Sequence, residues 1–259
     1  MLLDKILDEK KRIISGQKKI LPHKRNAEKK AFRKTLSLRR NILSSDFGII
    51  AEIKRASPSA GVIRENLDVA ATAKIYASMH VSGISVLTCE PFFNGRMEDI
   101  GIAREVVSIP LLMKDFIIDD YQIYAGRIHG ADAVLLILAT LPDADFLNLI
   151  GAAENLGMEM LLEVHTRADL ERVLHLVGRW DNKILGINNR DLDTLHTDLG
   201  TTLNLIKFVP RDKMLVISES GIRNRDDIER LKDAGVRGVL VGEVLLKSTN
   251  MKGKLKELM

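Results

Sequence analysis

The 259-residue sequence has one cysteine, few aromatic residues and no long apolar segment. The single cysteine, Cys89, excludes an intramolecular disulfide and provides no pair of thiolate ligands for a metal, as is usual in a reducing compartment. No segment approaches the roughly 18 apolar residues of a membrane span. The first residues lack the continuous apolar run of a signal peptide. We therefore expect a cytoplasmic protein without a membrane partner.

Positive charge is concentrated at the start of the chain. Residues 1–40 contain 14 Lys and Arg against 4 Asp and Glu, whereas the whole chain has a formal net charge of +4. A basic segment can bind nucleic acid, but this one has a single aromatic residue, Phe32, and no recognisable nucleic-acid-binding motif. A solvated helical face is the more common explanation, so we expect no nucleic acid partner.

Short apolar runs recur at fairly regular intervals and are separated by amphipathic segments. Eight runs have the length and composition of buried strands: residues 48–53, 84–87, 111–113, 133–137, 158–162, 184–187, 214–217 and 238–241. Apolar residues at helical spacing indicate helices at residues 68–79, 121–129, 143–156, 167–177 and 224–234. This alternation predicts an α/β protein with a parallel sheet, and eight such units close into a (β/α)8 TIM barrel. A doubly wound open sheet is the alternative.

About 47 residues precede the first expected strand. Residues 2–14 and 30–43 have apolar residues at helical spacing, so we interpret residues 1–47 as an N-terminal helical extension packed on the barrel. The sequence has no linker or low-complexity segment, and its length suits one barrel. We therefore expect residues 1–259 to form a single domain.

The most informative segment ends the first expected strand, where Glu52 and Lys54 stand two residues apart. Alternate residues of a strand share a face, so both side chains project together from an apolar run. Charged side chains are rarely buried without a partner or a function. Residues 57–61, Ser-Pro-Ser-Ala-Gly, are typical of a turn at the carboxyl end of the strand. Parallel α/β enzymes have their active sites at this end.

Polar residues also follow the later strands and would meet at the same rim. Lys114 is either a general acid, with a pKa lowered by partial burial beside Lys54, or an ordinary lysine extending to solvent from a strand end. Glu163 is either a proton-transfer group or the partner of a lysine in a structural ion pair. His165 is more typical of a structural histidine, because no second histidine stands at metal-binding spacing. We therefore expect no metal site.

Amide and glycine residues mark the last three strands. Asn188 either caps a turn or, with Arg190, belongs to a binding site in which the guanidinium clamps a carboxylate. Residues 220–221 (Ser-Gly) and 242–243 (Gly-Glu) follow the seventh and eighth strands. TIM barrels commonly bind phosphate there through backbone N–H groups. Glu243 would have to direct its side chain away from a phosphate bound in this way.

Seven motifs, taken together, resemble the indole-3-glycerol phosphate synthase family over the chain from about residue 1 to its end. They occur in the family's order at residues 50–54 with 57–59 (IAEIK, SPS), 85–88 (SVLT), 92–95 (FFNG), 114–116 (KDF), 162–165 (LEVH), 186–190 (GINNR) and 219–221 (ESG). The resemblance implies a barrel with an N-terminal extension and an enzyme of tryptophan biosynthesis. The implied reaction converts 1-(2-carboxyphenylamino)-1-deoxyribulose 5-phosphate, a small anionic phosphosugar, to indole-3-glycerol phosphate, carbon dioxide and water, without a metal or organic cofactor.

The same resemblance implies roles for individual residues. Lys114 corresponds to the general acid of ring closure, and Glu163 to a group that exchanges protons during loss of the carboxylate and water. Lys54 and Glu52 support them. The remaining implied contacts are with substrate: Ser57, Asn188 and Arg190 for the anthranilate part, Ser220, Gly221, Gly242 and Glu243 for the phosphate, Phe93 and Phe116 for the aromatic pocket, and Glu219 beside them.

Four positions depart from the family's usual pattern. Cys89 stands where Asp is common, Arg96 replaces a common Ser, and residues 79–80 are Met-His where Gly-Gly is frequent. Two other kinds of protein stay open. A phosphoribosylanthranilate isomerase would share the phosphate loops but would not require Lys54, Lys114 and Glu163 together, and a non-catalytic barrel would bind ligand without turnover. We expect a monomer.

Overall fold

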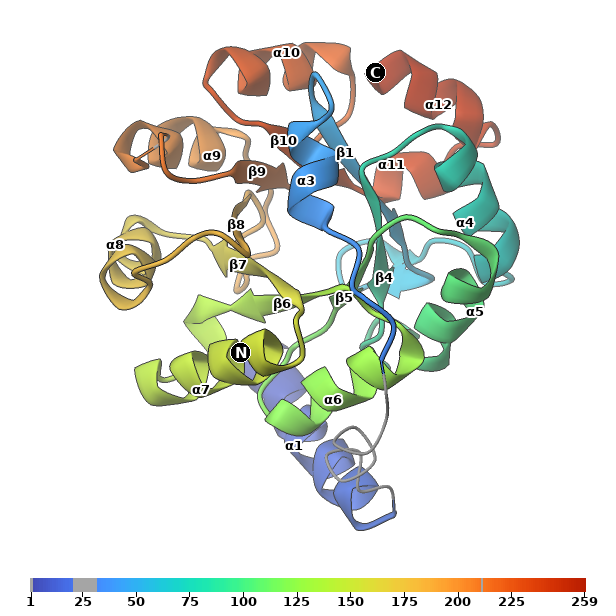
Figure 1. Cartoon of the computed structure of the whole chain (residues 1–259). Coiled ribbons are helices and arrows are strands. Elements are labelled where there is room, and N and C mark those ends of the chain that lie inside the picture. Colours follow the sequence, from blue (N-terminus) through green and yellow to red (C-terminus); the bar gives the residue numbers. More distant parts are fainter. Residues whose placement is uncertain (1, 21–31, 211) are drawn as a thin grey trace.

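The structure is a computed structural model that describes residues 2–20, 32–210 and 212–259. Eight parallel strands close into a barrel in which β1 pairs with both β4 and β10 (Figure 1). The strands are β1 (Gly48–Ile53), β4 (Gly83–Leu87), β5 (Leu111–Lys114), β6 (Ala133–Ile137), β7 (Glu159–Val164), β8 (Lys183–Asn188), β9 (Val216–Glu219) and β10 (Gly238–Val241). The predicted (β/α)8 barrel is confirmed, and the doubly wound alternative is wrong. All eight expected strands are present, with ends shifted by no more than two residues.

Helices form a ring around the strands (Figure 1). Five of them match the expected segments: α4 (Val69–Ser78), α6 (Asp120–His129), α7 (Asp143–Asn155), α8 (Arg167–Leu176) and α10 (Arg225–Asp233). The sequence patterns did not identify α5 (Glu98–Val106), α9 (Gly200–Leu205), α11 (Glu243–Leu246) or α12 (Met251–Leu258). Two short 3-10 helices, η1 (Leu138–Thr140) and η2 (Ile206–Phe208), and a small hairpin of β2 (Ala56–Ser57) and β3 (Gly61–Val62) complete the elements.

The inside of the barrel is filled by apolar side chains from the strands and from α3 (Leu38–Leu43). Leu38 and Ile42 of α3 are fully buried against this interior. The packing is so close that a Cβ added to Gly83 would lie 2.4 Å from Leu38 Cδ1, and one added to Gly48 would lie 2.8 Å from Ile42 Cγ2. Helix α3 therefore closes the amino-terminal end of the barrel.

The helix expected over residues 30–43 is wrong for residues 32–37, which are not helical; residues 30 and 31 lie outside the described residues. Several polar groups of this segment bond to the barrel. The Leu36 N–H donates to Asp132 Oδ1 (2.8 Å), and the Ser37 hydroxyl donates to Glu159 Oε1 (2.5 Å). The helix begins only after Ser37, whose side chain caps it by accepting from the Arg40 N–H.

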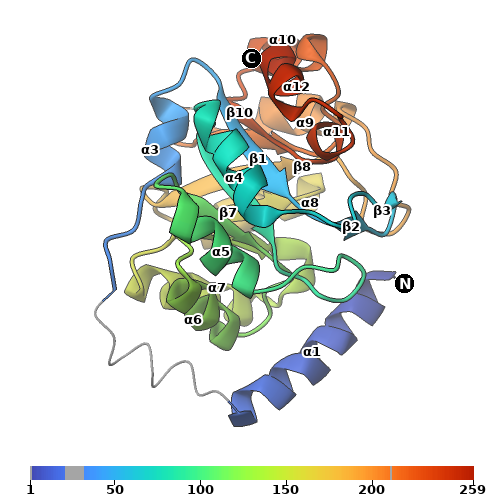
Figure 2. The same cartoon turned by 90° about the vertical axis from the view of Figure 1, so that its right-hand side faces the viewer.

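The first part of the expected extension is helical and longer than predicted, as α1 (Leu2–Ile20). Figure 2 shows the amino-terminal end of α1 on the side of the barrel where the β2–β3 hairpin lies, opposite α3. The extension thus contacts both ends of the barrel, with α1 near the carboxyl ends of the strands and α3 under the amino ends. No helix within the described ranges is both long and apolar enough to cross a membrane.

Candidate active site

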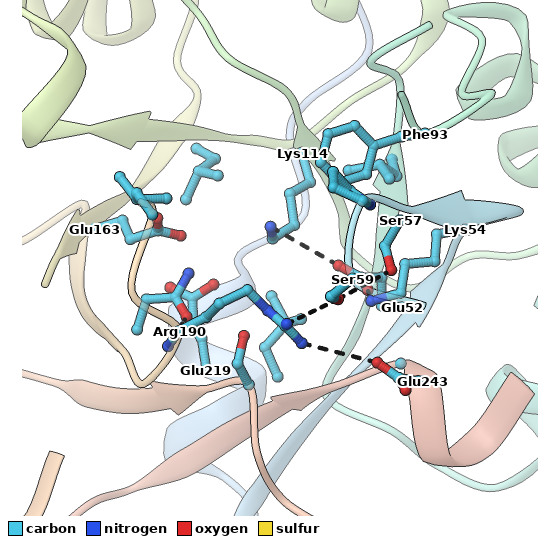
Figure 3. A pocket seen from close by; sticks show the side chains of 18 of the residues that line it. Glu52, Lys54, Ser57, Ser59, Phe93, Lys114, Glu163, Arg190, Glu219 and Glu243 are labelled. Carbon is cyan, nitrogen blue, oxygen red and sulfur yellow. Dashed lines mark hydrogen bonds and ion pairs between the residues drawn. The ribbon is translucent and has the colours of Figure 1, made fainter. Parts of the chain in front are cut away.

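A pocket opens at the carboxyl ends of the strands and brings together all the site residues expected from the sequence. These residues are Glu52, Lys54, Ser57, Phe93, Lys114, Phe116, Glu163, Asn188, Arg190, Glu219, Ser220, Gly221, Gly242 and Glu243. Figure 3 shows charged side chains from several strands and loops directed into the same cavity. The parallel barrel explains this convergence, because strands far apart in the sequence end at one rim.

Glu52 is a buried carboxylate between two lysines. Lys54 Nζ lies 2.5 Å from Glu52 Oε1, and Lys114 Nζ lies 3.9 Å from Glu52 Oε2. Burial by itself raises the pKa of Glu52, but the ammonium groups of Lys54 and Lys114 outweigh it and hold this pKa below its usual value. Glu52 is therefore ionised and fixes the two lysines relative to each other.

Lys114 at the end of β5 faces carboxyl groups from three other strands. Burial lowers the pKa of Lys114, but Glu52, Glu163 and Glu219 together raise it above its usual value. The expectation that partial burial beside Lys54 would lower this pKa is therefore wrong. The sequence alone did not reveal why the Lys114 pKa is raised, because the three carboxylates come from the distant strands β1, β7 and β9. A protonated ammonium in a buried pocket suits donation of a proton, as expected of a general acid.

Glu163 and Glu219 are buried carboxyl groups whose pKa values are shifted in opposite directions. Burial and the charge of Glu163 raise the pKa of Glu219 well above its usual value. Burial also acts on Glu163, but contacts with His165 and the charge of Lys114 outweigh it and lower the Glu163 pKa. Within the described chain, Oε2 of Glu163 and both oxygens of Glu219 have no hydrogen-bond partner. These directions favour ionisation of Glu163 before Glu219.

Ser220 and Gly221 line the pocket where the sequence predicts a phosphate site. Both have positive φ, 65° and 82°, a backbone conformation that residues other than glycine rarely adopt. Gly242 precedes the first turn of α11, and a Cβ there would lie 2.5 Å from Glu52 Oε1. The side chain of Glu243 is engaged by Lys247 Nζ at 2.7 Å and by Arg190 Nη2 at 3.8 Å. Its Oε1 is thus already paired with a cation.

Arg190 reaches across the pocket mouth from the loop after β8. Its Nη1 donates to the Ser59 hydroxyl at 2.8 Å and to the Leu195 carbonyl at 3.1 Å. The Asn188 side chain accepts the Arg190 backbone N–H at 3.0 Å. These bonds orient the guanidinium over the cavity, where Figure 3 shows it between Ser59 and Glu243. From the sequence, Ser59 is only part of the motif at residues 57–59. Its hydrogen bond with Arg190 depends on the fold.

The apolar wall of the pocket is built by two rings and by α1. Phe93 and Phe116 lie with ring centroids 6.1 Å apart, and Leu2, Leu3 and Ile6 also line the cavity. The sequence patterns identified the two phenylalanines but none of the α1 residues. Their only signal was the apolar face of a helix, which does not say what that face covers.

The comparisons with known proteins agree over nearly the whole chain. The family model for indole-3-glycerol phosphate synthase matches residues 3–258. The chain belongs to this family. The synthase from Carboxydothermus hydrogenoformans is 41% identical over 256 residues, covering 96% of each chain. The synthase from Trichodesmium erythraeum is 48% identical over 210 residues, covering 80% of this chain and 70% of its own.

Among solved structures, the 3-hexulose-6-phosphate synthase from Salmonella typhimurium is similar, with a TM-score of 0.64 and 14% identity over 82% of this chain and 96% of its own. At this identity the likeness concerns the barrel alone.

One of the sequence departures noted above has a structural counterpart. His80 has φ of 55°, in the left-handed region that glycine adopts without strain.

Proposed function

We propose that this member of the synthase family closes the indole ring of 1-(2-carboxyphenylamino)-1-deoxyribulose 5-phosphate and releases carbon dioxide and water. The observation that carries the proposal is the grouping of Lys114 with Glu52, Glu163 and Glu219 in one pocket that Ser220 and Gly221 also line. The Ser220–Gly221 turn suits the phosphate, and the apolar wall suits the aromatic ring. The protonated lysine and ionised glutamate suit proton transfer in both directions.

In the first step a carbon–carbon bond forms between the ring carbon that bears the carboxylate and the ketone carbon of the sugar. Lys114 donates a proton to the ketone oxygen, which becomes a hydroxyl. Glu52 and Lys54 hold the Lys114 ammonium in place. Loss of carbon dioxide leaves its bonding electrons in the ring and restores aromaticity.

The second part removes water from the five-membered ring. The hydroxyl leaves with one added proton, and one proton is lost from the neighbouring CH2 group, so the double bond of the indole forms. Glu163 is the base for this loss, since its lowered pKa keeps it ionised. These steps balance with one proton taken up from solvent, because Lys114 and the leaving hydroxyl together need two protons and the CH2 group returns one: the substrate carboxylate and one proton give indole-3-glycerol phosphate, one carbon dioxide and one water.

The remaining pocket residues hold the substrate. Ser57, Asn188 and Arg190 position the anthranilate part and its carboxylate, for which a guanidinium is the suitable partner. Ser220, Gly221, Gly242 and Glu243 surround the phosphate, and Glu219, whose pKa is raised, contacts substrate in the same pocket. Phe93 and Phe116 pack against the aromatic part.

The test is the appearance of indole fluorescence when the purified protein meets this substrate. We expect turnover by the wild type and none detectable by Lys114→Ala. Lys74→Ala is the matched control, because Lys74 is exposed on α4, away from the pocket. A folded wild type without turnover would favour another phosphate-binding barrel or a non-catalytic one. Lys114→Ala with a near-normal rate would contradict the assigned acid.

We further propose a monomeric cytoplasmic enzyme, with residues 1–259 as one domain and neither a nucleic acid nor a membrane partner. The carboxy-lyase chemistry above needs no group beyond the side chains named, so we propose no cofactor. Light scattering should give a mass near the 28.9 kDa of one chain, and turnover should persist after dialysis against EDTA.

A further inference from the structure

His165 is a buried titratable group next to the pocket that the steps above leave without a role. Its side chain is 8% exposed, and its Nε2 lies 3.1 Å from Glu163 Oε1, which is an ion-pair distance. Within the described part of the chain neither ring nitrogen makes a hydrogen bond of normal geometry, so this contact is one of charge and close approach. Glu163 lines the pocket, whereas His165 does not. The imidazole therefore contacts the expected base without being one of the residues that line the pocket.

The local backbone fixes His165 in this place. Glu163 is the last but one residue of β7, and His165 is the first residue after it, so both side chains leave the same face of the strand. The His165 N–H donates to Asp169 Oδ2 at 3.2 Å. Asp169 also closes the capping box of α8 with Thr166. The turn that carries the imidazole is thus tied to the start of a helix.

Titratable and polar groups from several elements face this pair. Lys114 of β5 and Glu219 of β9 act on Glu163, and the Asn188 amide of β8 also bonds to it. The Asp191 carboxylate after β8 has a lowered pKa, mainly from bonds with Thr194 and partly from the charge of His165. The imidazole therefore contacts the Glu163 carboxylate and acts on Asp191 only through its charge.

The contact between His165 and Glu163 bears on which of the two buried carboxyl groups, Glu163 or Glu219, carries a proton. Two adjacent acids that share one proton can place it on either member, and the environment decides which one ionises. Lys114 faces both Glu163 and Glu219, so it does not by itself distinguish them. His165 contacts only Glu163 of the two.

We propose that His165 is a positioning residue that orients the Glu163 carboxylate and keeps it ionised as the base, while the neighbouring Glu219 retains the proton. This inference rests on the proposed function and adds to it the group that selects the base. His165 itself transfers no proton to or from the substrate.

The experiment compares His165→Leu and His165→Gln with the wild type, using kcat and kcat/KM from the lowest pH at which each protein stays folded up to pH 9, because the pKa of Glu163 is lowered to about 2. His165→Leu removes the contact, so the acid limb of kcat/KM should move to higher pH by about one unit, the size of shift given by a nearby opposite charge. KM on the plateau should change less than about threefold, because His165 does not line the pocket. His165→Gln keeps an N–H donor and should lie between Leu and wild type. His175→Leu, on the exposed side of α8, is the matched control and should superimpose on the wild type.

A His165→Leu profile with its acid limb at the wild-type pH would overturn the proposal. So would an equal loss at every pH with Gln no better than Leu, which is the pattern of a purely structural role. Circular dichroism checks that each variant is folded. The titration of the substrate's own groups is common to all variants and cancels in the comparison.

A readout without turnover separates this inference from the proposed function. The full chain labelled with 13C at the glutamate carboxyl carbons, with the Glu163 signal assigned by Glu163→Gln, reports protonation directly. We expect that signal to titrate at higher pH in His165→Leu than in the wild type, and an unchanged titration would overturn the role of His165. A folded wild type that makes no indole would overturn the proposed function but leave this result interpretable.

Discussion

Lys10 of helix α1 places its Nζ 2.7 Å from Oδ1 of Asp115, the residue that directly follows Lys114. Both side chains are almost fully buried, and Thr88 donates a further hydrogen bond to Asp115 Oδ2 at 2.9 Å. One turn earlier on the same helix, Ile6 lines the pocket together with Leu2 and Leu3. The ion pair therefore joins the apolar wall of the pocket to the strand end that carries the expected acid.

Lys10→Ala should weaken substrate binding. The change leaves Asp115 buried without its cation, which costs about 3–5 kcal/mol when a buried pair is broken, and α1 should leave the pocket mouth. We expect KM to rise by about tenfold or more, measured by indole fluorescence, since each 1.4 kcal/mol of lost contact is about a factor of ten.

Lys11→Ala is the control for this change. Lys11 is 67% exposed and pairs only with Asp8 at the surface, so KM should stay within about twofold of the wild type. An unchanged KM in Lys10→Ala would show that the α1 wall is not needed for binding.

The sequence predicted the barrel and its rim well, because apolar runs and strand-end polar residues are local features. It failed where the partner is distant in the chain. Residues 32–37 have a helical pattern but bond to Asp132 and Glu159, about 100 and 120 residues away. The pKa of Lys114 is raised by carboxyls from three other strands, and α1 faces a pocket that periodicity alone does not reveal.

Glu163→Gln should reduce the rate far more than the affinity. The amide keeps the size of the side chain but cannot accept the proton, and loss of a positioned base typically costs about 10²–10⁴-fold. We expect kcat to fall within this range and KM to change only a few-fold in steady-state assays. A rise in KM at constant kcat would instead identify Glu163 as a binding residue.

Glu219→Gln should stabilise the protein at neutral pH. Because the pKa of Glu219 is raised in the folded state, its contribution to stability is complete below the unfolded pKa of about 4.3 and is lost as pH rises toward the folded pKa. Glutamine does not ionise, so this loss disappears in the variant. Urea unfolding should show a larger free energy of unfolding than wild type at pH 7.5 and little difference at pH 4.

The effect of pH on stability has the opposite sign for Glu163. Because its pKa is lowered in the folded state, its ionisation stabilises the fold above the unfolded pKa, and this contribution is lost as pH falls. Glu163→Gln should therefore be less stable than wild type at pH 7.5. Equal responses of the two glutamine variants at that pH would contradict the assigned protonation states.

Leu38→Ala should destabilise the fold without changing the chemistry. Leu38 is fully buried against the barrel interior, and removal of such a side chain typically costs about 2–5 kcal/mol. Leu43→Ala, in the same helix but 45% exposed, should cost about 0.5 kcal/mol or less. Thermal melts measure both, and KM of the folded Leu38→Ala protein should match the wild type. A melting temperature equal to that of Leu43→Ala would mean that α3 does not close the barrel.

The closure of the amino-terminal end of the barrel by α3 also bears on how molecules enter and leave the pocket. Leu38 and Ile42 lie beneath the interior side chains at one end of the barrel, and the pocket beside α1 lies at the other end. For the proposed reaction, carbon dioxide and water are small enough to pass a bound phosphosugar. Indole-3-glycerol phosphate is not, and we expect its phosphate to bind where the phosphate of the next substrate binds. The product therefore competes with the substrate for the same pocket, and it must leave before the next reaction cycle begins.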